Sequence, residues 1–169
     1  TKREIRAVTL STLAPIPGEL LWDVGAGCGS IAIEWMRSHR GCRAIAIERH
    51  PTRLQYIAEN ASNLGVPELK IIAGEAPEAL ANLPQPNAIF IGGGVTAEGL
   101  LETCWNYLDE GGRLVVNAVT VESEFKVLQW HDRYGGELIR IVIQRVGAIG
   151  SFQGWKPLAP VTQWAVVKG

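Results

Sequence analysis

The stretch from Leu20 to Ile33 constrains the fold more than any other part of the chain. It reads L-L-W-D-V-G-A-G-C-G-S-I-A-I, an apolar run interrupted only by Asp23 and followed by alternating glycines. A segment with helical character begins directly after Gly25, Gly27 and Gly29. This pattern predicts a β-strand, a tight turn and a helix N-terminus, an arrangement that brings backbone N–H groups close to a bound ligand.

Predicted strands and helices alternate along most of the chain. Strands are expected near residues 20–24, 43–48, 69–73, 87–91, 113–119, 137–146 and 161–167, with helices near 1–13, 30–39, 51–64, 100–108 and 122–133. The first helix has Thr1 and Glu4 at the spacing of a capping box. Alternation of this kind predicts a right-handed, mostly parallel sheet with helices on both faces.

The last two predicted strands break this rhythm. The linker over residues 147–160 is too rich in glycine and proline to form a crossover helix, so the final strand must pair antiparallel with its neighbour. We therefore expect an α/β fold of the Rossmann-like class I methyltransferase type, with a seven-stranded, mostly parallel sheet and an antiparallel terminal strand.

Composition narrows the class of protein. A chain of 169 residues is expected to form a single domain over residues 1–169, and its net charge of −1 gives no support to a nucleic-acid partner. No apolar run approaches the length of a membrane span, and the three cysteines show no C-x-x-C spacing. We expect a cytoplasmic location, no membrane and no metal. Because the chain begins at Thr1, inside a predicted helix, we expect a domain cut from a longer protein.

The glycine turn favours one ligand class. An acid stands two residues before Gly25, and Ser30 replaces the third glycine of the dinucleotide pattern G-x-G-x-x-G. A pyrophosphate would be repelled by Asp23, whereas S-adenosylmethionine offers an ammonium and a sulfonium. We therefore predict an S-adenosylmethionine site, with S-adenosylhomocysteine as the product.

The ends of the second and third predicted strands add candidate cofactor contacts. Glu48 ends the second strand, where a carboxylate can accept both ribose hydroxyl protons or can simply be a solvated acid. Gly74, Glu75 and Ala76 follow the third strand, where this fold usually holds adenine. Glu75 is interpreted equally well as an ordinary acid at a helix start.

The next two strands point to the methyl acceptor. Gly92, Gly93 and Gly94 follow the fourth strand, where small residues would let a flat substrate approach the sulfonium, unless they only form a flexible loop. Gly92 is assigned to the cofactor and Gly93 to the substrate. Asn117 is the one polar side chain of the fifth strand and either binds substrate or satisfies a neighbouring loop. An N-P-P-Y type motif, typical of methylation of nucleobase amino groups, is absent.

Several motifs together resemble one methyltransferase family. These are T-K-R-E-I-R-A, L-W-D-V-G-A-G-C-G-S, A-I-E-R, G-E-A-P-E-A-L, I-F-I-G-G and G-G-R-L-V-V-N-A-V-T. The chain is similar in these motifs to the decarboxylating precorrin-6Y C(5,15)-methyltransferases of cobalamin biosynthesis, both to the stand-alone enzyme and to the C-terminal domain of the fused protein. The resemblance implies a precorrin substrate that is methylated at carbon 15 and loses carbon dioxide from the acetate side chain on ring C.

The resemblance also implies site residues and partners. The implied cofactor contacts are Thr1, Gly25, Ala26, Gly27, Cys28, Gly29, Glu48 and Ala76. Because a reduced tetrapyrrole bears many carboxylates, basic residues are expected at the rim, namely Arg3, Arg6, Arg49, Arg145 and Lys156. The family implies a homotetramer, and a fused N-terminal methyltransferase domain is a further expected partner. No catalytic residue is predicted, because the sulfonium is already activated and positioning supplies most of the acceleration.

Three alternatives stay open at this level. The first is an RNA methyltransferase of the same fold, and the second is a cofactor-binding subunit that has lost catalysis. The third is a nucleotide-dependent dehydrogenase.

Overall fold

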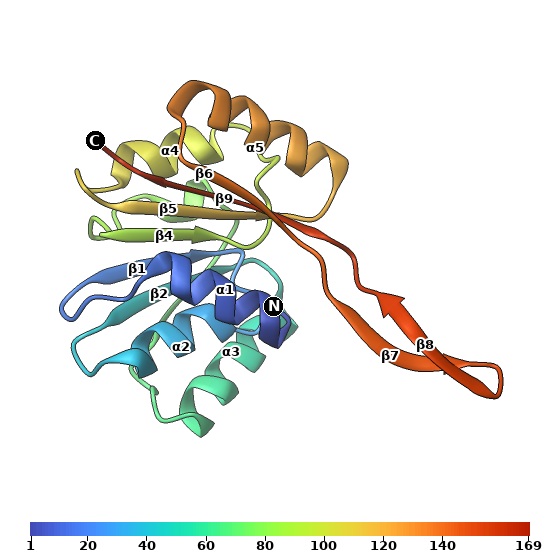
Figure 1. The fold of residues 1–169 in the computed structure, drawn as a ribbon. Coiled ribbons are helices and arrows are strands. Elements are labelled where there is room, and N and C mark those ends of the chain that lie inside the picture. Colours follow the sequence, from blue (N-terminus) through green and yellow to red (C-terminus); the bar gives the residue numbers. More distant parts are fainter.

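The computed structural model describes residues 1–169 and contains one seven-stranded sheet (Figure 1). Its strands, in spatial order, are β3 (Lys70–Ala73), β2 (Arg43–Glu48), β1 (Leu20–Val24), β4 (Ala88–Ile91), β5 (Arg113–Ala118), β9 (Val161–Val167) and β6 (Glu137–Ile141). The first five strands in that order run parallel, and β9 is antiparallel to both of its neighbours. The predicted sheet and its reversed last strand are confirmed.

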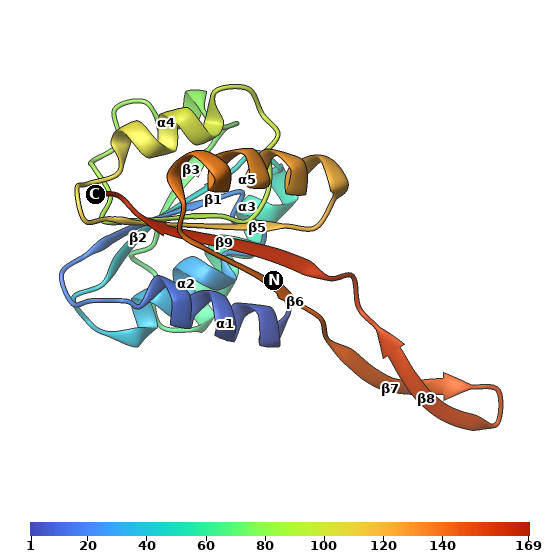
Figure 2. The same cartoon turned by 45° about the horizontal axis from the view of Figure 1, so that its top comes forward.

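Helices cover both faces of the sheet (Figure 2). Helices α1 (Arg3–Leu13), α2 (Ser30–Ser38) and α3 (Pro51–Asn63) lie on one face, while α4 (Leu100–Tyr107), α5 (Val121–Tyr134) and the short 3-10 helix η1 (Glu78–Leu80) lie on the other. Each face has its own core, since successive side chains of a strand point to opposite faces. In β1, Trp22 packs with the α4 and α5 side, and Leu21 with the α1 and α2 side. None of the helices is both long and apolar enough to cross a bilayer.

Two expectations about local structure were wrong. Lys2, and not Thr1, is the N-cap of α1, and no side chain caps this helix. The expected strand over residues 137–146 ends at Ile141, where the chain leaves the main sheet. The linker that follows is not irregular, because most of it forms a separate two-stranded hairpin.

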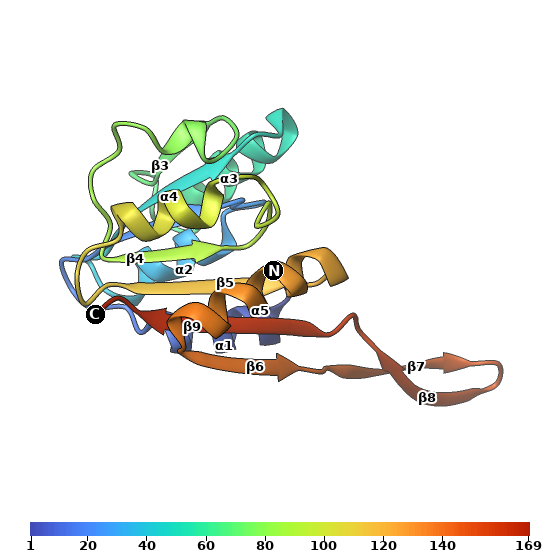
Figure 3. The ribbon, with the colours of Figure 1, turned by 90° about the horizontal axis from the view of Figure 1, so that it is seen from above.

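This hairpin consists of β7 (Gln144–Ile149) and β8 (Phe152–Pro157). Figure 3 shows it projecting away from the body of the molecule, beyond the ends of β6 and β9. Glycine and proline were interpreted as signs of a loop, but Gly147 and Gly154 face each other across the two strands. There they leave space for the side chains of Lys156 and Ile149, since a Cβ at either glycine would lie within 3 Å of them.

Candidate functional site

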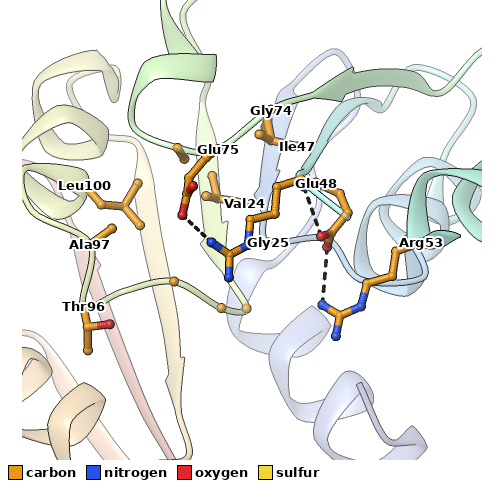
Figure 4. Close-up of a pocket in the computed structure, with 15 residues that line it drawn as sticks. Val24, Gly25, Ile47, Glu48, Arg53, Gly74, Glu75, Thr96, Ala97 and Leu100 are labelled. Atoms are coloured by element: carbon orange, nitrogen blue, oxygen red, sulfur yellow. Dashed lines mark hydrogen bonds and ion pairs between the residues drawn. The ribbon is translucent and has the colours of Figure 1, made fainter. Parts of the chain in front are cut away.

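A cavity of about 390 Å³ lies at the carboxyl ends of the parallel strands (Figure 4). We call it the strand-end cavity. It is lined by Val24, Gly25, Ile47, Glu48, Arg49, Arg53, Gly74, Glu75, Ala76, Gly92, Gly93, Gly94, Thr96, Ala97 and Leu100. Ligands of open α/β sheets bind at this edge, where the strand order reverses direction. In this sheet the reversal occurs between β1 and β4, directly beside the glycine turn.

The two glycine segments of the cavity touch each other. Gly25 has a φ of +70°, and a Cβ built there would lie 2.8 Å from the carbonyl oxygen of Gly93. Only glycine satisfies both the left-handed backbone and this close approach. Gly93 itself has open space around its Cβ position. The loop after β4 therefore packs directly on the loop after β1.

Glu48 holds the glycine turn through its carboxylate. Its Oε2 accepts the N–H of Gly27 at 2.8 Å, and its Oε1 accepts the N–H groups of Arg49 and His50 at 3.0 Å each. A carboxylate has about four acceptor sites, so backbone donors use most of them. Arg53 approaches Oε2 at 3.8 Å. If Glu48 accepted hydrogen bonds from both ribose hydroxyls, as predicted, it would have to give up one of these bonds. A hydrogen bond from a single ribose hydroxyl would not require this.

Asp23 lies beneath the turn and does not line the strand-end cavity. Its Oδ2 accepts the N–H of Ala32 at 3.0 Å, so it caps α2 in place of Gly29, which has no side chain. Burial raises the pKa of this carboxyl to about 7, against the opposing effect of the Ala32 hydrogen bond. Its Oδ1 is buried without a partner. The charge of Asp23 is thus set by its surroundings as well as by any ligand.

Glu75 and Arg49 form an ion pair at the cavity. Figure 4 shows Glu75 and the start of α4 on one side of the cavity, and Glu48 and Arg53 on the other. Both partners of the ion pair are exposed. The sequence allowed two roles for Glu75, a cofactor contact or an ordinary acid at a helix start. The structure adds a third role, because Glu75 forms a salt bridge with Arg49 at the edge of the cavity.

A second cavity of about 310 Å³ adjoins the first. We call it the apolar cavity. It is lined by Thr1, Lys2, Ile5, Phe90, Gly92, Asn117, Val119, Ile143, Leu158, Ala159 and Val161. Gly92 is the one residue that lines both cavities.

Asn117 lines the apolar cavity, but both polar atoms of its amide already have protein partners. Its Nδ2 donates to Thr9 Oγ1 at 3.0 Å, and its Oδ1 accepts from Gln163 Nε2 at 2.8 Å. Gln163 is itself buried and also accepts a hydrogen bond from Thr12. Asn117 therefore has a structural role in the protein, but its partners lie in α1 and β9 and not in the neighbouring loop that was expected.

The remaining predicted residues are divided between the two cavities and the surface. Within the glycine turn only Gly25 lines the strand-end cavity, together with Gly74, Glu75, Ala76, Gly92 and Gly93 from the other loops. Neither cavity is lined by Ala26, Gly27, Cys28 or Gly29, and Thr1 lines the apolar cavity instead.

The two predicted substrate contacts on the hairpin lie outside both cavities. Arg145 and Lys156 sit opposite each other near its base. Arg145 donates to both carboxylate oxygens of Glu4 at 2.9 and 2.7 Å, which ties the hairpin to the start of α1. The backbone N–H of Glu4 and then this guanidinium hold the pKa of Glu4 below its usual value. No cluster of three or more potential metal ligands is present.

The residues missed by sequence reasoning are chiefly apolar. Ile5, Phe90 and Leu158 meet only because α1, β4 and the hairpin base converge, and no local pattern signals this. Arg53 carries a weak signal, because it lies in the first turn of α3, two residues after Pro51 and five after Glu48.

Fold and site together define a class of protein. The chain forms an open sheet with a reversed last strand, a glycine turn after the first strand and an acid at the end of the second strand. These features together define a Rossmann-like methyltransferase domain. The chain belongs to the precorrin methyltransferase domain family, whose family model matches residues 1–168.

Individual relatives agree with this family. A precorrin-6Y C(5,15)-methyltransferase [decarboxylating] from Sinorhizobium sp is 57% identical over 169 residues, which cover 100% of this chain and 41% of the relative. The chain thus spans less than half the length of that curated relative. A probable cobalt-precorrin-6B C(15)-methyltransferase (decarboxylating) from Pyrobaculum aerophilum is 35% identical, with 95% of this chain and 85% of the relative covered.

A solved structure is similar over almost the whole chain. The C-terminal domain of precorrin-6Y C5,15-methyltransferase from Rhodobacter capsulatus superposes with a TM-score of 0.93 and 44% identity, covering 99% of this chain and 90% of that one.

Proposed function

We propose that residues 1–169 act as one S-adenosylmethionine-dependent methyltransferase domain. It methylates carbon 15 of a precorrin and removes carbon dioxide from the acetate side chain on ring C. The observation that carries this proposal is the meeting of two unlike cavities at Gly92, one polar and beside the glycine turn, the other mostly apolar. Membership of the precorrin methyltransferase domain family supports the choice of substrate.

The strand-end cavity suits the cofactor through features of its own residues. Glu48 is preorganised by three backbone N–H groups and keeps acceptor capacity for a ribose hydroxyl. The bare backbone at Gly25 and Gly92 allows close approach, and Glu75 and Ala76 lie where adenine is expected. Thr1, Asp23 and the rest of the turn stay predicted cofactor contacts. Bound S-adenosylmethionine supplies an activated methyl group, and the protein's part is to hold donor and acceptor in line.

Decarboxylation asks for a different arrangement. The bond between the acetate methylene and its carboxylate breaks, carbon dioxide leaves, and the electron pair passes into the conjugated macrocycle. The methylene carbon then takes a proton from water. The protein favours this step if it pairs the other carboxylates with basic groups and leaves one carboxylate in apolar surroundings, where its charge is poorly solvated.

The alternatives receive less support. An RNA methyltransferase would have to recognise a base edge by hydrogen bonds, yet the amide of Asn117 is engaged within the protein. The net charge of −1 also leaves no surplus of positive charge to bind the phosphates of a nucleic acid. An inactive subunit would bind S-adenosylhomocysteine without turnover, and a dehydrogenase would bind NAD in its place.

Mass spectrometry after incubation tests the proposal. Wild-type protein with a precorrin and S-adenosylmethionine should yield a product that has gained one methyl group and lost carbon dioxide. Omission of S-adenosylmethionine should abolish the methyl gain. Calorimetry with S-adenosylhomocysteine and with NAD separates the alternatives. Binding of S-adenosylhomocysteine without any change in the mass of the precorrin indicates the inactive subunit. Binding of NAD without binding of S-adenosylhomocysteine contradicts the proposal.

Assembly and location stay predictions. The expected homotetramer would use the projecting hairpin, whose exposed apolar side chains are Val146, Ile149, Phe152 and Trp155. The fused methyltransferase domain and the cytoplasmic location are likewise expectations; the greater length of the first relative supports the former.

A further inference from the structure

The apolar cavity has no assigned ligand, although it opens beside the proposed methyl donor. We infer that it receives one ring of the tetrapyrrole, inserted edge-on between α1 and the base of the hairpin. This inference rests on the proposed function and specifies where the acceptor lies. The strand-end cavity is left to the cofactor, with Gly93, the predicted substrate contact, directly after the shared residue Gly92.

The position of the cavity fits an acceptor site. Methyl transfer needs donor and acceptor atoms at about 3 to 3.5 Å before reaction, so the two sites must meet without a side chain between them. They meet at Gly92, where a Cβ would lie 2.8 Å from the ring of Phe90. Gly93, the next residue, lines the strand-end cavity and has open space at its Cβ position.

The lining of the cavity indicates the chemistry of its occupant. Ile5, Phe90 and Val161 provide apolar walls, and Asn117 has both amide atoms engaged. The interior therefore suits the apolar body of a pyrrole-derived ring better than a nucleobase, whose edges need hydrogen-bond partners. Exposed Lys2 lines the same cavity and can pair with a peripheral carboxylate.

The size of the cavity limits how much of the macrocycle enters. Cavities that enclose whole drug-sized ligands measure about 300 to 1,000 Å³, and this one, at about 310 Å³, is at the lower end. We assign it to one ring and its substituents, with the rest of the macrocycle outside.

The outer wall belongs to the hairpin base. Leu158 and Ile143 line the cavity side by side, and the N–H of Leu158 donates to the carbonyl of Ile143 at 2.9 Å. Ala159, the next residue, also lines the cavity and is exposed. A larger side chain at this position can fill the cavity without entering the core.

Substitution at Ala159 tests the inference. Ala159→Phe should raise the KM for the precorrin at least about tenfold, equivalent to about 1.4 kcal/mol of lost binding, while the Kd for S-adenosylhomocysteine stays within about twofold. The matched control is Ala81→Phe, because Ala81 is also an exposed alanine in a connection between elements and lines neither cavity. Val119→Phe repeats the test from the β5–α5 connection, where Val119 is exposed and lines the cavity.

The outcomes separate this inference from the proposed function. If the wild-type protein methylates the precorrin and both cavity variants match it, the inference is wrong and the proposed function stands. An equal rise in KM and in the Kd for S-adenosylhomocysteine would assign the cavity to the cofactor and also overturn the inference. If the wild-type protein leaves the precorrin unchanged, the proposed function fails and this inference fails with it.

Discussion

Asp23 is the most deeply buried acid of the site, with 1% of its surface exposed. Its place in β1 explains this burial, because alternation puts it on the same face as Leu21, under α2. The charged form loses hydration there, and one hydrogen bond from Ala32 compensates only in part. Asp23 therefore holds a proton at a pH where an exposed aspartate would be ionised.

Because Asp23 holds this proton in the folded state, the free energy of unfolding falls as the pH rises. Between the ordinary pKa of 3.8 and the folded value of about 7, the folded state binds more protons than the unfolded state, so the free energy of unfolding decreases with pH. Asp23→Asn removes this dependence. Relative to wild type, the variant should gain up to about 4 kcal/mol between pH 4 and pH 8, at 1.36 kcal/mol per pKa unit. Its unpaired amide adds a cost that does not vary with pH.

Urea unfolding of both proteins across this pH range measures the difference. The diagnostic quantity is the slope of the difference against pH, not its absolute value. A flat difference would show that the Asp23 carboxyl has its ordinary pKa in the folded protein.

At the scale of elements, the site depends on two loops that touch. Gly25 and Gly27 both have a positive φ, +70° and +63°, but only a Cβ at Gly25 meets the loop after β4. Gly27→Ala should therefore cost only the left-handed backbone penalty of about 1 to 2 kcal/mol. Gly25→Ala should lose at least about 2 kcal/mol more, through the clash with the Gly93 backbone, and should weaken S-adenosylhomocysteine binding more than Gly27→Ala does.

Comparison of Gly25→Ala with Gly27→Ala separates the cost of the left-handed backbone from the cost of the clash between the two loops. Urea unfolding gives the two stability losses, and calorimetry gives the two affinities. Equal losses of stability would mean that the loop after β4 moves aside without cost, and that the packing between the loops contributes little.

The elements that sequence alone predicted are those specified by local patterns. The strand–turn–helix from Leu20 to Ile33, the acid that ends β2 and the reversed last strand all follow from apolar runs, glycines and linker composition. What local patterns do not show is which distant groups meet. The capping of α2 by Asp23 and the use of Asn117 within a buried network depend on pairings between separate elements.

The hairpin was missed for a related reason. Its glycines and Pro157 are typical of loops, and its apolar side chains have no core to face, so neither alternation nor burial marks it as paired strands. The apolar cavity was missed with it, because Ile143 and Leu158 at the hairpin base complete one wall. The sequence therefore indicated the strand-end cavity, whereas for its neighbour it indicated only the separate residues Thr1 and Asn117 and not the cavity that they share.

On the scale of the whole molecule, the hairpin is the part whose stability depends most on a partner. Figure 3 shows it extending past the sheet, while near its base Arg145 pairs with Glu4 of α1. Phe152 and Trp155 are 77% and 68% exposed and, being three residues apart on one strand, point to opposite faces. Isolated two-stranded hairpins are marginally stable in water, so a partner for both faces would add stability that the chain alone does not provide.

We expect that partner to be further copies of this chain, in line with the predicted homotetramer. Substituting both aromatics, Phe152→Ser with Trp155→Ser, should weaken self-association by about 4 kcal/mol, roughly a thousandfold, if each contributes about 2 kcal/mol as a central interface residue. Thermal unfolding of the body should change little, because neither side chain belongs to either core. The matched control is Val121→Ser at the start of α5, since Val121 is 78% exposed and does not belong to the hairpin. Analytical ultracentrifugation at tens of micromolar measures the mass of each protein. A monomeric wild type, or an oligomer that the double variant leaves intact, would contradict assembly through the hairpin.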